Sequence, residues 1–154
     1  MKKILIATAL LSLSLNIFAA EVSWETLKLL DFDSKTKKNI IKPDLQKALG
    51  KEVTIKGFMM PLDYEAKEVV EFLFMPYVPA CMHVPPPPAN QLVLVKMKKG
   101  AKIKPSFYPV ELTGKISVEA NADLESSYKM EGFTIKELKE FTPPPAAAPK
   151  GVHP

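Results

Sequence analysis

The chain has 154 residues and a formal net charge of +4, which suits one small domain with a modest core. Every basic residue is a lysine, and the lack of arginine argues against recognition of phosphate or of nucleic-acid bases, where arginine is the favoured side chain. The single cysteine excludes an intramolecular disulfide and leaves a reactive thiol, an intermolecular bridge or a metal ligand.

Residues 1–19 have the composition of a secretory signal peptide. Lys2 and Lys3 form a basic start, and the apolar run that follows is shorter than the roughly 20 residues of a membrane-spanning helix. We therefore predict cleavage after Ala19 and a mature periplasmic chain that is not stably inserted in a membrane. The alternative interpretation is an N-terminal membrane anchor.

Two short helices are predicted in the next part of the chain. Glu21–Leu30 is amphipathic and Ser23 is placed to cap its first turn. Asp31–Asn39 is polar and reads as a loop. Pro43–Leu49 is predicted as the second helix because proline suits a first helical turn and Gly50 suits the C-terminal end.

Five segments further along have the composition of β-strands. They are Lys51–Met60, Val69–Tyr77, Leu92–Val95, Pro109–Glu119 and Tyr128–Ile135. The first alternates polar and apolar residues up to Gly57, where the phase changes and a bulge or bend is expected. The second is almost wholly apolar, which is typical of a strand buried on both faces.

Short strands joined by turns predict a mainly β protein, namely a small five-stranded antiparallel barrel, OB-like (oligonucleotide/oligosaccharide-binding-like), with short N-terminal helices. We expect the signal peptide to be followed by a helical segment over residues 20–50 and a barrel-like domain over residues 51–141. Thr134–Phe141 is predicted to contain a terminal helical turn. The Pro/Ala-rich tail, residues 142–154, is expected to be disordered.

The segment Tyr77–Gln91 is the strongest candidate for a functional site. It contains the only cysteine, Cys81, and one of two histidines, His83. The residues after them include four consecutive prolines, namely Pro85, Pro86, Pro87 and Pro88. Prolines favour an extended backbone, in which side chains two residues apart share a face. We therefore expect the thiol and the imidazole to lie on one face of a stiff segment.

Three motifs resemble an exported proteobacterial family of unknown function, domain of unknown function 3299. They are Gly57-Phe58-Met59-Met60-Pro61-Leu62, Glu71-Phe72-Leu73 and Cys81-Met82-His83-Val84-Pro85-Pro86-Pro87-Pro88-Ala89-Asn90-Gln91. The resemblance covers about Val53 to Gly132 and implies a small periplasmic protein with a barrel-like domain. It also implies an association with transport systems linked to metal handling, and it gives no indication of a particular enzymatic activity. The characteristic positions of the family are Cys81, His83, Asn90 and Gln91.

Metal binding is the first functional hypothesis. A thiolate and an imidazole are ligands of zinc, and of copper(I) when thioethers join them, so Cys81 and His83 are predicted to form part of a zinc or copper(I) site. Two ligands do not complete a site, and the others must come from this chain or from a partner such as an envelope transporter or another periplasmic protein. Nearby oxygen donors are Asp63, Glu65, Glu68 and Gln91, and nearby sulfur donors are Met59, Met60, Met75 and Met82.

Two other functions compete with metal binding. A metal-free interaction module would dock to an envelope complex through the proline loop, with Asn90 and Gln91 fixing the loop or bonding a ligand. A thiol-dependent enzyme would need His83 to activate Cys81, but no third orienting group is evident, so we predict no enzyme. The purely structural interpretation makes Cys81 a buried apolar residue and His83 a hydrogen-bonded loop residue.

Two further groups of residues have structural interpretations. Five lysines surround one predicted turn, namely Lys96, Lys98, Lys99, Lys102 and Lys104. Such a run is usually a solvated face, and a weak contact with anionic lipid is the alternative. The phenylalanines Phe58, Phe72, Phe74 and Phe107 are predicted to lie in the core.

Overall fold

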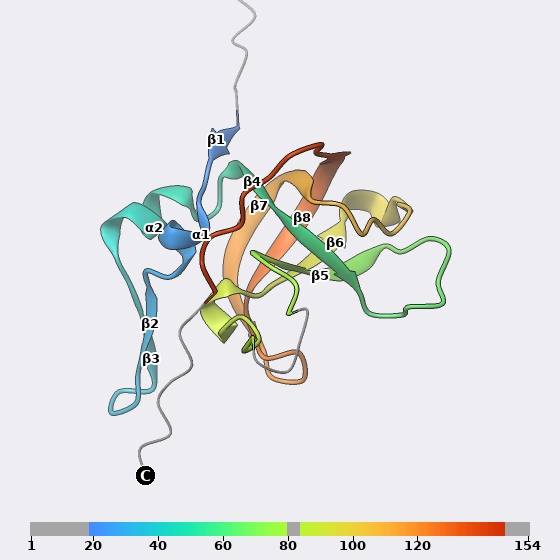
Figure 1. Ribbon diagram of the computed structural model, residues 1–154. Helices are drawn as coiled ribbons and strands as arrows, with labels where there is room; N and C mark the ends of the chain where they lie inside the picture. Colours follow the sequence, from blue (N-terminus) through green and yellow to red (C-terminus); the bar gives the residue numbers. More distant parts are fainter. Residues whose placement is uncertain (1–18, 80–83, 147–154) are drawn as a thin grey trace, which may run out of the picture.

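The computed structural model describes residues 19–79 and 84–146, which form a mainly β structure with two short α-helices (Figure 1). The helices are α1 (Trp24–Leu27) and α2 (Pro43–Ala48), and two 3-10 turns are η1 (Ala89–Gln91) and η2 (Lys98–Gly100). The strands are β1 (Ala20–Glu21), β2 (Leu30–Asp33), β3 (Lys38–Ile41), β4 (Glu52–Pro61), β5 (Glu71–Met75), β6 (Val93–Met97), β7 (Val110–Asn121) and β8 (Ser126–Glu137).

The local signals for both helices are confirmed. The Ser23 hydroxyl accepts a hydrogen bond from the Thr26 backbone N–H at 3.2 Å and caps α1, although this helix is only four residues long. Pro43 opens α2, and Gly50 follows its end with a φ of +74°, a conformation that glycine adopts without strain.

The prediction of a loop over Asp31–Asn39 is wrong, because β2 and β3 form an antiparallel hairpin that projects from the main sheet (Figure 1). The Asp33 carboxylate organises its turn by accepting from the Lys35 N–H at 2.8 Å and the Thr36 hydroxyl at 2.7 Å. The Thr36 bond is the main reason that the pKa of Asp33 lies below its ordinary value. The Asp33 side chain therefore forms the turn that allows β2 and β3 to pair.

The prediction of five strands, all antiparallel, is also wrong. The main sheet has six strands in the order β1-β4-β5-β6-β8-β7, and β4 pairs additionally with β7. The β1–β4 and β6–β8 pairs are parallel. The parallel β6–β8 pair arises because β8 returns antiparallel to β7 and inserts beside β6. No local sequence pattern specifies this placement.

Gly57 marks a change of partner in β4 instead of the expected bulge. Residues 52–57 pair with β7 and residues 58–61 pair with β5, with no register shift in β4. A side chain at Gly57 would place its Cβ 2.5 Å from the Met75 carbonyl oxygen and 2.9 Å from the Trp24 ring. Gly57 therefore lets the indole of Trp24 pack directly on the strand, where its Nε1 donates to the Lys56 carbonyl at 2.6 Å.

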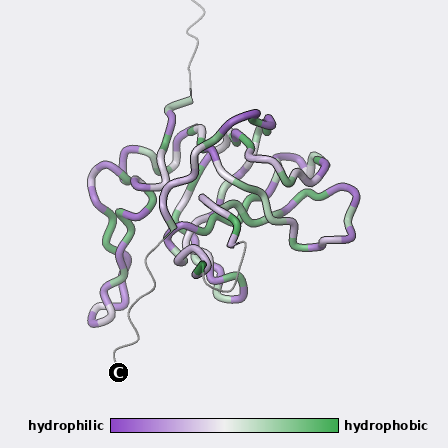
Figure 2. The backbone as a smooth tube through the Cα atoms, viewed as in Figure 1, coloured by the Kyte–Doolittle hydropathy of each residue, from purple (hydrophilic) through white to green (hydrophobic). Residues whose placement is uncertain are grey.

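The strands bury one continuous face. Their inward side chains and those of the two helices form the main apolar cluster, in which Leu27, Leu45 and Tyr128 are fully buried. A second, smaller cluster lies on the opposite face of β4 and β5 and contains Leu73 and Met75. The prediction that β5 is buried on both faces is therefore confirmed. Figure 2 shows the hydrophobic residues concentrated on the central strands and hydrophilic residues on the outlying turns.

The predicted helical turn over Thr134–Phe141 is wrong, because β8 continues to Glu137 by pairing with β7. Beyond it, the Phe141 ring packs against Phe58 with ring centroids 5.8 Å apart. Residues 142–146 have no regular secondary structure, and the rest of the predicted tail lies outside the described residues. Within the described ranges, the helices are all too short and too polar to cross a membrane.

Candidate functional site

The predicted metal ligands Cys81 and His83, together with Met82, lie outside the described residues. The structure describes the chain on either side of them, up to residue 79 and from residue 84 onward. The Tyr77 hydroxyl donates a hydrogen bond to the Pro85 carbonyl at 3.3 Å, so the two flanks of this segment are tied to each other. The Tyr77 side chain itself is buried.

The four prolines present two of their rings to solvent. Pro86 and Pro88 are exposed, whereas Pro87 is buried and Pro85 is half-buried. Pro88 has φ −66° and ψ 160°, which is the polyproline geometry expected from the sequence. The Gln91 N–H then donates to the Pro88 carbonyl at 2.7 Å and turns the chain into η1. Because only Pro86 and Pro88 face outward, they are the rings available to a partner.

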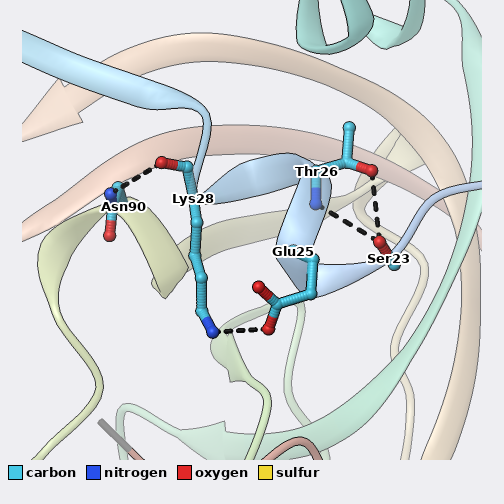
Figure 3. A network of polar contacts seen from close by, with 5 residues as sticks. All are labelled: Ser23, Glu25, Thr26, Lys28 and Asn90. Carbon is cyan, nitrogen blue, oxygen red and sulfur yellow. Dashed lines mark hydrogen bonds and ion pairs between the residues drawn. The ribbon is translucent and has the colours of Figure 1, made fainter. Parts of the chain in front are cut away.

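Asn90 bonds the backbone of another segment, whereas the sequence predicted a bond to the backbone of its own loop or to a ligand. Its side-chain amide Nδ2 donates to the Leu30 carbonyl at 3.1 Å. The same nitrogen lies 3.4 Å from the Lys28 carbonyl (Figure 3). This amide therefore joins η1 to the chain between α1 and β2. Gln91, the other predicted residue, is buried with 3 % of its surface exposed.

The segment that Asn90 holds is itself fixed by short-range polar contacts. Figure 3 shows the Ser23 hydroxyl beside both the hydroxyl and the backbone N–H of Thr26, and the Lys28 ammonium beside the Glu25 carboxylate. These contacts hold α1, and α1 sets the direction of the carbonyls that Asn90 binds. Asn90 thus acts as a structural residue in the described part of the chain.

The other predicted metal donors are separated from one another by their roles in the fold. Met59 and Met75 are buried in different apolar clusters. Asp63 accepts from the Glu65 N–H at 2.9 Å, and Glu68 lies 3.8 Å from the Lys102 ammonium. Across residues 19–79 and 84–146, no three side chains among Cys, His, Asp and Glu come together as a metal site would require.

An apolar hollow of about 280 Å³ lies where β4 ends, and the sequence did not predict it. Its lining residues come from β4 and from loops on either side of the sheet, and they are Phe58, Met59, Met60, Pro61, Tyr64, Val78 and Phe107. Around it, large side chains lie in solvent: Phe107 is 86 % exposed, Tyr64 72 % and Val78 47 %. The prediction that Phe107 belongs to the core is therefore wrong.

Fixed backbone presents these exposed side chains. Val69 and Ile103 exchange two backbone hydrogen bonds of 2.8 and 2.9 Å, which join the loop before β5 to the loop before β7. The Ser106 hydroxyl donates to the Glu137 carboxylate at 2.6 Å and accepts from the Tyr108 N–H at 3.1 Å. Phe107 lies between Ser106 and Tyr108, which these hydrogen bonds fix, and its side chain is held out from the surface.

One signal in the sequence points to this surface. Phe107 and Tyr108 are adjacent aromatic residues between Pro105 and Pro109. Prolines on both sides predict a loop, and two large rings in a short surface loop have little core to enter. Exposed apolar residues that gather around a hollow are typical of an interaction site, whereas single ones carry no such meaning.

Comparison with known proteins gives a family and a fold. A family model described as "Protein of unknown function (DUF3299)" matches residues 19–137. A crystal structure of a DUF3299 family protein from Pseudomonas aeruginosa PAO1 is similar, with a TM-score of 0.59 and 24 % sequence identity over 81 % of this chain and 99 % of that chain. No curated protein matches. At this identity, the likeness to the solved structure concerns the fold alone.

Proposed function

The chain belongs to the DUF3299 family, and from that premise we propose that it is an exported binding module, not an enzyme, that docks to another protein of the cell envelope. The observation that carries the proposal is the exposure of Tyr64, Val78 and Phe107 around an apolar hollow. Aromatic side chains beside a pocket are typical anchors of protein–protein interfaces. The partner supplies an apolar side chain that fills the hollow and covers these rings.

The proline segment is connected to this surface through Tyr77. Val78 lines the hollow, and its neighbour Tyr77 is hydrogen-bonded to Pro85, where the proline run begins. The segment then leads away from the hollow, because Pro88 lines a separate hollow with Leu30, Phe32 and Asn39 of the hairpin. A proline segment has little conformational freedom to lose on binding, which favours association. We define the docking surface as Tyr64, Val78 and Phe107.

Substitution of the two most exposed rings tests this function. The partner is first identified from protein captured in the envelope fraction and then purified for titration. We expect Tyr64→Ser/Phe107→Ser to weaken its affinity by at least about tenfold, the change that follows from losing about 1.4 kcal/mol of contact energy. The matched control is Phe32→Ser/Ile40→Ser, which removes exposed apolar residues from the hairpin. Equal affinities of wild type and the ring variant would refute the docking surface.

Export is the second component of the proposal. It is supported by the basic and apolar pattern of residues 1–19 and by the small residue Ala19 at the expected cleavage point. N-terminal sequencing of the protein recovered from the periplasmic fraction should give Ala20 as the first residue. Recovery of the chain only with an intact Met1, or only from the cytoplasm, would contradict export.

Binding of zinc or copper(I) by Cys81 and His83 is a second candidate function. It is supported by the chemistry of the two side chains, a thiol and an imidazole, which are ligands of these ions. It is also supported by the hydrogen bond between Tyr77 and Pro85, which ties together the two flanks of the segment that contains Cys81 and His83. We expect reduced mature protein to bind one of these ions and both Cys81→Ser and His83→Ala to weaken that binding. His153→Ala is the control because it removes the only other histidine. No binding by wild type, or equal binding by all variants, would exclude this candidate.

Chelators separate the two candidates. Docking through the apolar surface needs no ion, so the partner should bind with unchanged affinity after the metal is removed. If chelation abolishes partner binding, the ion is part of the interface and Cys81 and His83 belong to it.

We also propose a finer description of the fold as an OB-like barrel. The strands β4, β5, β6, β8 and β7 are paired in that order, and the β4–β7 pairing joins the last strand to the first. A small Greek-key barrel of five strands has such a closed order. Amide hydrogen exchange provides the test: the β4–β7 amides should be protected as strongly as those between β7 and β8, and fast exchange along β4–β7 would contradict closure.

A further inference from the structure

A second hollow, of about 550 Å³, lies on another face of the sheet, over the outer side of β6, β7 and β8 and beside η2. Its lining residues are Lys96, Met97, Lys98, Lys99, Gly100, Lys115, Ser117, Glu119, Lys129, Met130 and Glu131. The volume lies in the range of small-molecule sites, about 300–1,000 Å³. None of these residues belongs to the docking surface.

Positive charge exceeds negative charge in this hollow. Five lysines line it against two glutamates. The Lys129 ammonium lies 2.7 Å from the Glu119 carboxylate, whose hydrogen bond raises the pKa of Lys129, so one lysine and one glutamate neutralise each other. The four other lysines have no carboxylate within 4.0 Å in the described parts of the chain. Their charge is therefore available to a ligand.

The register of the strands explains why charges gather here. Glu131 is opposite Lys96 on β6 and opposite Lys115 on β7, so all three side chains point to the same face of the sheet. Above them, the Lys98 ammonium lies 4.6 Å from the centre of the Phe133 ring, a cation–π contact that limits its motion. Lys98 is therefore held beside the hollow, and Lys96, Lys99 and Lys115 are exposed around it.

We propose that this basic hollow binds a small ligand that carries a phosphate group on a hydroxylated frame. The lysine ammonium groups bind phosphate as point charges, and the lack of arginine makes the attraction sensitive to salt. Glu131 provides a carboxylate acceptor for the hydroxyl groups of such a ligand, and the Ser117 oxygen, whose proton is donated to the Lys129 carbonyl at 3.3 Å, provides a second acceptor. Either a free sugar phosphate or the headgroup of an anionic lipid has this chemistry.

Calorimetric titration of the mature protein at low ionic strength tests the proposal, with glucose 6-phosphate, glucose and phosphatidylglycerol vesicles as probes. We expect glucose 6-phosphate or the vesicles to bind, and glucose not to bind. Binding of glucose 6-phosphate identifies a soluble ligand, and binding of the vesicles alone identifies a headgroup. Either result supports the basic hollow only if the variants below behave as expected.

The variant Lys99→Gln/Lys115→Gln removes two charges from the hollow, and Lys35→Gln/Lys38→Gln removes two from the hairpin turn as the matched control. We expect the first to weaken binding at least tenfold and the second to leave it within twofold. Equal weakening by both variants would show non-specific attraction and overturn the proposal, as would an absence of binding by every probe or equal binding of glucose and glucose 6-phosphate. Circular dichroism confirms that both variants fold, and the Tyr64→Ser/Phe107→Ser variant should bind like wild type.

Discussion

At the scale of single residues, Tyr128 connects the sheet to the N-terminal helices. Its hydroxyl, on β8, donates to the Leu27 carbonyl at the end of α1 at 2.6 Å, in a fully buried position. Burial raises the pKa of Tyr128 well above its ordinary value, because the charged phenolate would lose its hydration. One side chain thus satisfies a carbonyl at a helix end that water does not reach.

Removal of this hydroxyl should destabilise the fold. We expect Tyr128→Phe to lower the free energy of unfolding by about 1–3 kcal/mol, because it leaves the buried Leu27 carbonyl without a donor. The control is Tyr108→Phe, at a residue that is 68 % exposed, which should change stability by less than about 0.5 kcal/mol. Urea unfolding of the three proteins measures both effects, and equal midpoints for wild type and Tyr128→Phe would contradict this account of the bond.

The raised pKa of Tyr128 also predicts how stability depends on pH. The unfolded chain releases the phenol proton near the ordinary pKa of 10.0, whereas the folded chain keeps it to a higher pH. The stabilisation is therefore complete below pH 10 and is lost as the pH rises above 10 towards the folded-state pKa. Urea unfolding between about pH 9 and pH 11 should show a shallower loss of stability in Tyr128→Phe than in wild type. An equal loss of stability in wild type and Tyr128→Phe over this pH range would contradict the prediction.

At the scale of secondary-structure elements, local sequence patterns predicted which segments form helices or strands better than they predicted which strands pair with each other. Pro43 and Gly50 bounded α2 correctly because capping depends on residues close in sequence. The β2–β3 hairpin was missed because the stretch between its apolar ends is mostly polar and its turn depends on the Asp33 side chain. The parallel β6–β8 pair was missed because strand order depends on contacts between distant segments, which alternation of polar and apolar residues does not encode.

The same distinction holds for the candidate site. Asn90 was expected to bond the backbone of its own loop or a ligand, whereas it bonds the Leu30 carbonyl, 60 residues away in the sequence, a contact that no local pattern encodes. The exposure of Phe107 was not predicted, since it depends on the Val69–Ile103 bridge and on the Ser106–Glu137 hydrogen bond between distant segments. The geometry at Cys81 and His83 stays a prediction from the sequence.

Asn90 gives a testable link between two elements. Asn90→Ala removes the donor to the Leu30 carbonyl and should release the β2–β3 hairpin from η1, with a loss of about 1 kcal/mol in local stability. Hydrogen exchange of the β2 and β3 amides should accelerate roughly fivefold in this variant. Asn39→Ala, which changes an exposed amide within the hairpin, should leave exchange unchanged. If both variants exchange like wild type, Asn90 does not hold the hairpin.

At the scale of the whole molecule, the outer surface of the sheet is divided by chemistry. Near the end of β4 and along β5 it is apolar and forms the second cluster and the hollow beside it. Over β6, β7 and β8 it is charged and forms the basic hollow. The inward faces of these same strands all contribute to one core. The apolar surface and the basic hollow therefore differ in chemistry although the same core lies beneath both.

The measurement that tests docking most directly is site-specific photo-crosslinking in cells that produce the protein. Benzoylphenylalanine is placed separately at Tyr64, at Phe107 and, as the control, at Phe32 on the hairpin, all three exposed in the free protein. The proposed function predicts that Tyr64 and Phe107 crosslink to one and the same envelope protein, identified by mass spectrometry, and that Phe32 does not. Crosslinks to that protein from all three positions, or no specific product at Tyr64 and Phe107, would contradict the central claim.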